Sequence, residues 1–240
     1  MQALSTKNKL FAIMGHDLKS PLMDIKSLIF ILKQMPQNLK PSDIVSHAST
    51  IENRLTTLLE LLNNLLNWGM KERNLLTYTP ENTDVASIVE KTITIFEGQI
   101  QSKQLTIETI LPEQRKWTTD INMFEFIVRN LLSNAIKFSH PNQTIEITLI
   151  NANNLLTLTI KDSGIGMNKQ EKNKLFIQTS DKIKRGTNNE KGSGLGMSLS
   201  YEFIRQMNGT IHVESEQNEG TTIVVQFNMN TTKETKNNNC

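Results

Sequence analysis

The chain has 240 residues, with 26 lysines and arginines against 24 aspartates and glutamates, and its formal net charge is therefore +2. A charge this close to zero argues against a basic nucleic-acid-binding surface, so we expect no nucleic-acid partner. The single cysteine, Cys240, is the last residue, which excludes a disulfide framework and a cysteine-ligated metal site. No stretch reaches the roughly 20 apolar residues that span a bilayer, and no signal-peptide pattern is present. We expect a soluble, cytoplasmic protein whose membrane attachment, if any, comes from a sensor segment outside this chain.

Residues 1–72 have the periodicity of two helices joined by a turn at Met35–Pro41, with Ser42 as a candidate N-cap. One apolar stripe follows the first helix: Phe11, Met14, Leu18, Leu22, Ile25, Ile29 and Leu32. A coiled-coil seam follows the second: Ile44, Ala48, Ile51, Leu55, Leu58, Leu62 and Leu65. Two wide apolar stripes cannot enclose a core by themselves. We therefore expect an antiparallel helical hairpin that forms a four-helix bundle in a homodimer.

Residues 78–228 predict a second domain of the α+β class, in which a mixed sheet packs on helices, and residues 229–240 predict a disordered tail. Helices are predicted at Asp84 to about Gln101, Asp120–Phe138, Asn168–Phe176 and about Leu195 to Met207. Strands are predicted at Leu105–Ile110, Thr144–Ile150, Leu155–Lys161, Thr210–Ser215 and Thr221–Phe227. The stretch Gln178–Ser193 has no periodicity.

His16 lies almost opposite the apolar stripe of the first helix, so its imidazole is expected to face solvent. Asp17 follows it, Ser20 shares its face one turn later, and Pro21 removes a backbone donor, which should bend the helix. An exposed imidazole beside a carboxylate can be held in one tautomer and can act as a nucleophile. A single surface histidine is more often simply solvated, so His16 alone decides nothing.

Asn130, Asn134 and Lys137 share one face of the helix predicted from Asp120. Amide oxygens suit a hard Mg²⁺ ion that bridges phosphates, and the lysine can meet phosphate charge. An ordinary solvated polar face is the alternative for this cluster taken alone.

Two glycine-bearing loops flank predicted elements: Asp162–Gly166 follows a strand, and Gly192–Gly196 precedes a helix. Glycines before a helix let backbone N–H groups approach an anion, and a carboxylate at a strand end can accept a hydrogen bond from an amine such as that of adenine. Neither a Walker A loop nor a dinucleotide-binding fingerprint occurs, which excludes the usual P-loop and Rossmann folds.

Taken in order, five segments resemble the H, N, G1, F and G2 boxes of sensor histidine kinases: HDLKSPL, NLLSNAIKFS, DSGIG, LFIQTS and GSGLGMSLS. The resemblance spans about residues 5–228. It implies a dimerisation and histidine-phosphotransfer hairpin joined to an ATP-binding domain of the type shared with gyrase, heat-shock chaperone and mismatch-repair ATPases. It also implies ATP and Mg²⁺ as cofactors, and the receiver domain of a response regulator as a partner that takes the phosphoryl group on an aspartate.

By this resemblance His16 is the phosphoacceptor, and Asp17 orients it and helps to take its proton. Ser20 stands where related kinases usually carry Thr or Asn implicated in dephosphorylating the regulator. Because serine departs from that pattern, phosphatase activity is less strongly implied than kinase activity.

The resemblance also assigns the nucleotide site. Asn134 and Asn130 resemble the Mg²⁺ ligands, Lys137 a phosphate contact, and Asp162 the carboxylate that binds adenine. Phe138 stands where an aromatic packs near the nucleotide, although it is equally suited to an ordinary core. The residues implied to shape the adenine loop and the lid over the phosphates are Gly164, Gly166, Gly192, Gly194, Leu195 and Gly196. Phe176 is expected to anchor the lid. Three cations of the lid could each reach the γ-phosphate: Lys182, Lys184 and Arg185.

Two other functions remain open at this point. An ATPase of the chaperone or topoisomerase class is disfavoured. By resemblance, that class carries a water-activating glutamate where Asn130 stands, and asparagine cannot act as a base. A binding-only pseudokinase or scaffold would also carry these motifs. We expect the remaining histidines and the two tryptophans to be solvated or structural: His47, His140, His212, Trp68 and Trp117. The handedness of the hairpin, and with it phosphorylation within or between chains, cannot be predicted from these patterns.

Overall fold

The computed structural model describes residues 21–34, 40–51, 54, 55, 58, 78–177, 185–188, 190 and 196–228. The chain divides into two compact units, Met1–Leu76 and Thr77–Cys240. The predictions for Trp68, for most of the hairpin turn and for the tail at 229–240 lie outside the described residues. Within the described part of the chain, no helix combines the length and the apolar character needed to cross a membrane.

The first unit is helical at residues 21–34 and 41–51. Arg54 Nε lies 3.4 Å from Asp24 Oδ2, an ion pair that joins the two helical segments as a hairpin requires. Ser42 is not the N-cap predicted for the second segment, because the helix already begins at Pro41. Proline is well suited to the first helical position, since its φ is preset and its missing N–H needs no partner there.

Large apolar side chains of both helical segments are exposed in the single chain. They include Leu22 at 53%, Ile29 at 42%, Ile44 at 44% and Leu55 at 48%, all from the two predicted stripes. Exposure of several large apolar side chains on one pair of helical segments is typical of an interaction surface. The homodimer predicted from the sequence is a hypothesis that would cover these side chains.

The second unit contains a five-stranded sheet in the order β2-β4-β5-β7-β6. The strands are β2 (Thr106–Ile110), β4 (Thr144–Ala152), β5 (Leu155–Asp162), β6 (Thr210–Glu216) and β7 (Gly220–Asn228). Strand β2 pairs parallel with β4, and the other three pairings are antiparallel. The mixed sheet expected from the sequence is therefore confirmed. Asn153 and Asn154 join β4 to β5 with φ values of 53° and 59°, the backbone that a tight hairpin turn requires.

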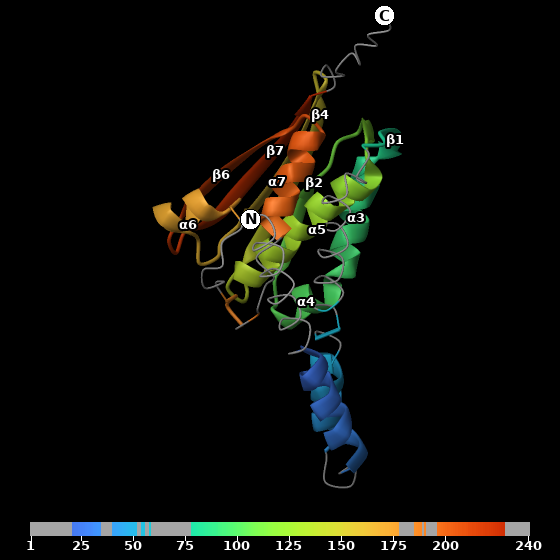
Figure 1. Cartoon of the computed structure of the whole chain (residues 1–240), viewed down its shortest axis with the longest axis vertical. Coiled ribbons are helices and arrows are strands. Elements are labelled where there is room, and N and C mark those ends of the chain that lie inside the picture. Colours follow the sequence, from blue (N-terminus) through green and yellow to red (C-terminus); the bar gives the residue numbers. More distant parts are fainter. Residues whose placement is uncertain are drawn as a thin grey trace, which may run out of the picture. The chain divides into compact units, whose positions relative to one another are not determined.

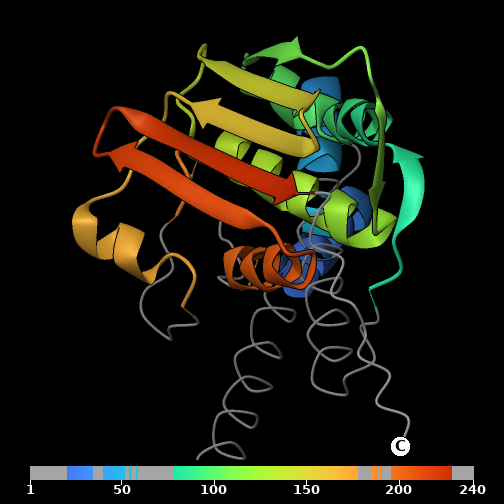
Figure 2. The same ribbon diagram turned by 90° about the horizontal axis from the view of Figure 1, so that it is seen from above.

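Helices α3 (Val85–Ile95), α5 (Ile121–Phe138) and α7 (Gly196–Gln206) lie along one face of this sheet (Figures 1 and 2). Every second side chain of β5 is buried against them, as a half-covered strand requires. Helices α5 and α7 lie side by side, and the rings of Phe126 and Phe203 meet edge to face at 5.1 Å. The short helix α6 (Lys169–Lys174) begins with a reciprocal capping box between Asn168 and Glu171. The α+β architecture predicted for this unit is confirmed.

The single helix predicted from Asp84 to about Gln101 is wrong, because two helices meet at Phe96: α3 and α4 (Glu97–Ser102). Phe96 leaves helical geometry with φ −93° and ψ 4°, and its ring is 1% exposed. The free energy gained by burying the Phe96 side chain at the junction exceeds that gained by continuing one straight helix. The predicted cap at Asp84 is confirmed, since its side chain accepts a hydrogen bond from the Ser87 amide at 2.8 Å.

Strands β1 (Glu81–Asp84) and β3 (Lys116–Thr119), which pair as a two-stranded antiparallel sheet, were not predicted. Each strand has only 4 residues, too few for an alternating pattern to be distinctive. Trp117 on β3 is 4% exposed, so it is the packing residue that we expected.

Candidate functional site

The candidate site is built on helix α5, whose N-cap Asp120 accepts a hydrogen bond from the Met123 amide at 3.0 Å, as predicted. Asn130, Asn134 and Lys137 lie on its half-buried side, while Leu131 and Leu132 on the opposite side are buried in the core. The helical spacing thus places these three polar side chains together, where they can contact a ligand.

Asn130 is held by helix α7. Its Nδ2 donates hydrogen bonds to Ser200 Oγ at 2.8 Å and to Met197 Sδ at 3.4 Å. A Cβ atom on Gly196, the first residue of α7, would overlap the Asn130 Oδ1 atom. Both the amide nitrogen and the amide oxygen of Asn130 therefore lie close to α7, and the oxygen is the atom that suits a hard cation.

Asp162, the last residue of β5, is 8% exposed. Burial raises the pKa of its carboxyl to about 6, while hydrogen bonds from the backbone N–H groups of Gly164 and Thr221 act in the opposite direction. The Gly164 amide donates to Asp162 Oδ1 at 2.9 Å. These two donors do not compensate fully for the loss of water. A further donor, such as the exocyclic amine of adenine, would stabilise the ionised carboxylate.

The loop after Asp162 is fastened to the C-terminal end of α5, which we call the α5 end (Ala135–Ser139). Ser139 and Gly164 form an isolated antiparallel bridge, and the Ile165 amide donates to the Phe138 carbonyl at 3.1 Å. A Cβ atom on Gly164 would overlap the Phe138 carbonyl oxygen, so this close approach requires glycine. Gly166 needs its φ of +56°, and a Cβ there would overlap the Glu216 carbonyl.

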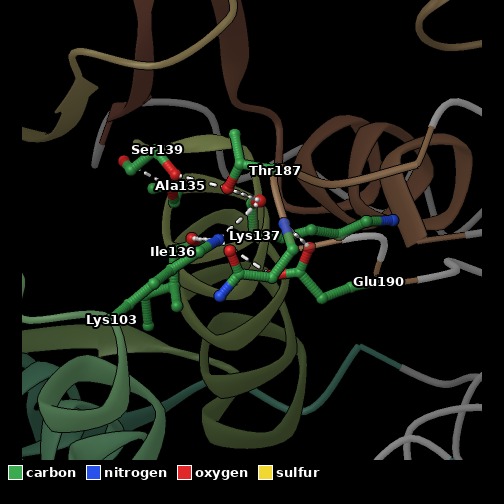
Figure 3. Close-up of polar contacts among 8 residues, drawn as sticks. Lys103, Ala135, Ile136, Lys137, Ser139, Thr187 and Glu190 are labelled. Carbon is green, nitrogen blue, oxygen red and sulfur yellow. Dashed lines mark hydrogen bonds and ion pairs between the residues drawn. The ribbon is translucent and has the colours of Figure 1, made fainter. Parts of the chain in front are cut away.

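A second segment, residues 185–188 with Glu190, also contacts the α5 end; we call it the 185–190 segment. The Thr187 amide donates to the Lys137 carbonyl at 3.1 Å, and Thr187 Oγ1 donates to the Ser139 carbonyl at 2.6 Å. Lys103 reaches the same place from the end of α4 and donates to the Ile136 carbonyl at 2.7 Å (Figure 3).

Sequence reasoning missed Lys103. It lies 33 residues before Ile136 in the chain, in no motif, and nothing in its local sequence distinguishes it from a solvated lysine. Only the tertiary structure brings it to the α5 end.

Aromatic residues named from the sequence also have definite contacts. Lys137 Nζ lies 4.8 Å from the centroid of the half-buried Phe138 ring, a cation–π contact. Phe176 stacks on Tyr201 of α7 with centroids 5.0 Å apart and an interplanar angle of 25°. This stacking joins the region after α6 to α7. His140 and His212 are exposed, as expected for solvated side chains.

Several predicted site residues lie outside the described part of the chain: His16, Asp17, Ser20, Lys182, Lys184, Gly192, Gly194 and Leu195. Arg185 is described and is exposed. Within the described ranges, no group of three or more His, Cys, Asp or Glu side chains could hold a metal ion. The donor set at α5 consists instead of amide oxygens, which fits a Mg²⁺ ion that keeps water and phosphate oxygens as its other ligands.

Residues 119–231 match the family described as histidine kinase-, DNA gyrase B- and HSP90-like ATPases. The sensor histidine kinase YvrG of Bacillus subtilis is 28% identical over 228 residues, which cover 93% of this chain and 38% of that protein. The sensor histidine kinase GacS of Pseudomonas protegens is 26% identical over 240 residues, which cover 98% of this chain and 26% of that protein. Residues 119–231 thus match this ATPase family, and the chain is similar to sensor histidine kinases over nearly its whole length.

Solved structures of histidine kinases share the fold of this chain. The Acinetobacter baumannii histidine kinase AdeS has a TM-score of 0.64 at 21% identity, over 90% of this chain and 98% of that one. Histidine kinase ThkA, solved in complex with the response regulator protein TrrA, has a TM-score of 0.63 at 17% identity, over 95% of this chain and 63% of that one. The chain spans well under half the length of its curated relatives YvrG and GacS, and the match to the ATPase family lies within its second unit.

The pKa of Asp162 predicts a pH-dependent stability of the protein. The unfolded carboxyl, with a pKa of 3.8, loses its proton before the folded one, whose pKa is about 6. The free energy of unfolding should therefore fall by about 3 kcal/mol as the pH rises through this window, and should then level off. Asp162→Asn should remove this component and should be the more stable form at pH 7. Urea unfolding of both proteins between pH 4 and pH 8 measures it, and a wild-type-to-variant difference that does not change with pH would contradict it.

Gly196→Ala should weaken ATP binding, because the new Cβ would push the Asn130 amide away from its place beside α7. We expect the Kd for ATP, measured by calorimetry, to rise by roughly tenfold, which corresponds to the loss of one good polar contact.

The matched control is Gly98→Ala, because Gly98 lies in α4 and a Cβ there meets nothing within 4 Å. It should leave the Kd unchanged and stabilise the fold by about 0.5–1 kcal/mol. Equal Kd values in the two variants would show that the position of Asn130 does not matter for ATP binding.

Proposed function

We propose that this chain transfers the γ-phosphoryl group of ATP to His16 and then passes it to an aspartate of a response regulator. The observation that best supports this function is the fastening of the Asp162 loop to the α5 end through the Ile165 amide and the Phe138 carbonyl. It places a buried carboxylate suited to adenine next to the helix that carries Asn134 and Lys137. A nucleotide base and its phosphates need these two kinds of contact at one place.

In this function Asp162 accepts a hydrogen bond from the adenine amine, in the loop shaped by Gly164 and Gly166. Asn130 and Asn134 hold Mg²⁺ through their amide oxygens, and Lys137 offsets phosphate charge. When bound, the ion neutralises charge on the phosphates. By the resemblance, Gly192, Gly194, Leu195 and Gly196 would form the phosphate-facing end of a lid.

The transfer step uses a ring nitrogen of His16 as the nucleophile. Its lone pair forms the N–P bond as the bond from the γ-phosphorus to the bridging oxygen breaks, and ADP leaves with that electron pair. Asp17 orients the ring and takes its proton. Phosphoryl transfer needs little covalent help from protein groups, so positioning and charge neutralisation provide most of the rate.

The partner that we propose is the receiver domain of a response regulator, which docks beside His16 on the helical hairpin. The structure of ThkA with TrrA supports a partner of this class, because it is a complex of a related fold with a response regulator protein. Ser20, four residues after His16 in the sequence, would take part in any dephosphorylation of the regulator. Membrane attachment would come from a sensor segment in a longer protein.

Hydrolysis of ATP by a chaperone-type mechanism is the second candidate, and the environment of Asn130 counts against it. Its amide nitrogen donates to Ser200 on α7, and an amide cannot accept the proton of an attacking water. A residue at this place is suited to holding a cation and not to activating water.

Incubation with Mg²⁺ and ATP labelled at the γ-phosphate should transfer label to the chain in an acid-labile, base-stable form, as expected for phosphohistidine. His16→Gln should abolish the label and leave the Kd for ATP unchanged, since the nucleotide site belongs to the other unit. His47→Gln, which removes another histidine of the same unit, is the control and should keep the label. Label that survives in His16→Gln would overturn the proposal.

The homodimer predicts a sedimenting mass of twice 27.3 kDa at micromolar concentration. Ile29→Asp would place a charge on the exposed apolar stripe and should shift the chain towards monomer. Ser27→Asp adds the same charge at an exposed polar position of the same helix and should leave the dimer intact. Analytical ultracentrifugation that finds a folded wild-type monomer would contradict this part of the proposal.

A further inference from the structure

Lys103, at the end of α4, has a buried ammonium group. The residue is 3% exposed, and lysine is rarely so deeply buried unless its charge is paired. Its Nζ donates to the Ile136 carbonyl at 2.7 Å, to the Lys137 carbonyl at 2.9 Å and to Glu190 Oε1 at 2.8 Å. An ammonium has three N–H donors, so each of them has an acceptor here.

Two of these acceptors are carbonyls of the last turn of α5. Carbonyls at this end of a helix lack partners within the helix, and they carry the negative end of its dipole. A buried cation is therefore favourable beside them. Lys103 thus caps a helix to which it does not belong, and α5 is the helix that carries Asn130, Asn134 and Lys137.

The third acceptor, Glu190, organises the 185–190 segment. Its Oε2 accepts a hydrogen bond from the Asn188 amide at 2.7 Å, and its carbonyl accepts one from the Gly186 amide at 2.9 Å. Its Oε1 pairs with Lys103 (Figure 3). One glutamate therefore folds the segment into a compact turn and attaches it to the buried ammonium.

The Lys137 peptide is where these contacts meet. Its carbonyl accepts hydrogen bonds from Lys103 Nζ at 2.9 Å and from the Thr187 amide at 3.1 Å. Lys103 and Thr187 therefore hold the backbone of a predicted phosphate-contacting residue from two sides. Loss of the ammonium would free both this peptide and the turn around Glu190.

We propose that Lys103 is a positioning residue for ATP: through Glu190 and the last carbonyls of α5, it holds the 185–190 segment beside the nucleotide site. The inference rests on the proposed function, because it concerns how that site is kept in its binding form. Lys103 does not touch the nucleotide in this account. It acts through the residues that it fixes, so its effect should appear in ATP binding and not in the chemical step.

Lys103→Met and Glu190→Gln test the contact in the full chain with Mg·ATP as substrate. Each should raise the KM of autophosphorylation by roughly tenfold and change kcat by less than about threefold. The change in KM is the size expected when one charge-assisted hydrogen bond that favours the binding form is lost. The double variant should raise KM by much less than the product of the two single effects, because both remove the same contact.

Lys161→Met and Glu146→Gln are the matched controls. Lys161 Nζ lies 2.7 Å from Glu146 Oε1 on the same domain, but the two side chains are 52% and 50% exposed. Exposed pairs of this kind contribute little, so KM should stay at the wild-type value. Equal KM changes in the control and test variants would mean that removal of any lysine–glutamate pair has this effect, which would overturn the proposal.

Hydrogen exchange of the Thr187 amide provides a readout that needs no activity. This amide should exchange faster in Lys103→Met and Glu190→Gln, whereas the Leu158 amide in the central strand β5 should keep its wild-type rate. If Lys103→Met does not fold, Glu190→Gln still tests the proposal. The Glu190 side chain is 36% exposed, so removal of its charge leaves the core intact.

The outcomes separate this inference from the proposed function. Suppose that the wild-type chain autophosphorylates but that both test variants keep the wild-type KM and the wild-type exchange rate of the Thr187 amide. This result would overturn the role of Lys103 and leave the kinase function in place. Faster Thr187 exchange without any wild-type phosphorylation would overturn the kinase function, and with it the positioning role that depends on it.

Discussion

The organisation of the proposed nucleotide site depends on one constraint, which is that the last carbonyls of helix α5 need donors from outside the helix. Each carbonyl of the α5 end accepts at least one hydrogen bond, and the donors beyond the helix come from Lys103, Ile165 and Thr187. These three residues belong to segments that are far apart in the sequence. A single helix end therefore gathers the end of α4, the loop after β5 and the 185–190 segment around the polar face of α5.

The two buried ionisable groups of the site, Lys103 and Asp162, differ in how fully the fold supplies their hydrogen-bond partners. Lys103 has an acceptor for each N–H, so its ammonium contributes to the structure before any ligand arrives. Asp162 has two backbone donors that do not offset its burial, and the pKa of its carboxyl is raised to about 6. A group that the fold leaves short of partners favours a ligand that supplies them, at a cost to the stability of the free protein. This difference is the reason why we propose Lys103 as a positioning residue and Asp162 as a binding residue.

The parts of this architecture that depend on local patterns could be predicted. The N-cap Asp120, the polar face of α5 and the alternation of the central strands all follow from neighbouring residues in the sequence, and the Asp162–Gly166 loop was found by its motif. The break at Phe96 and the position of Lys103 could not be predicted, because burial among residues far away in the chain decides both. Asp162 was predicted as a binding residue by resemblance, whereas its raised pKa depends on the tertiary surroundings.

The central claim is that a nucleotide binds where the Asp162 loop meets the α5 end. The most direct test is the amide NMR spectrum of the deuterated full chain, recorded with and without a non-hydrolysable ATP analogue and Mg²⁺. The account predicts that the largest shifts fall on Asp162–Gly166 and Asn130–Phe138, and that the outer strand β2 changes little. Saturating analogue that leaves both segments unchanged, or that shifts mainly β2, would contradict it.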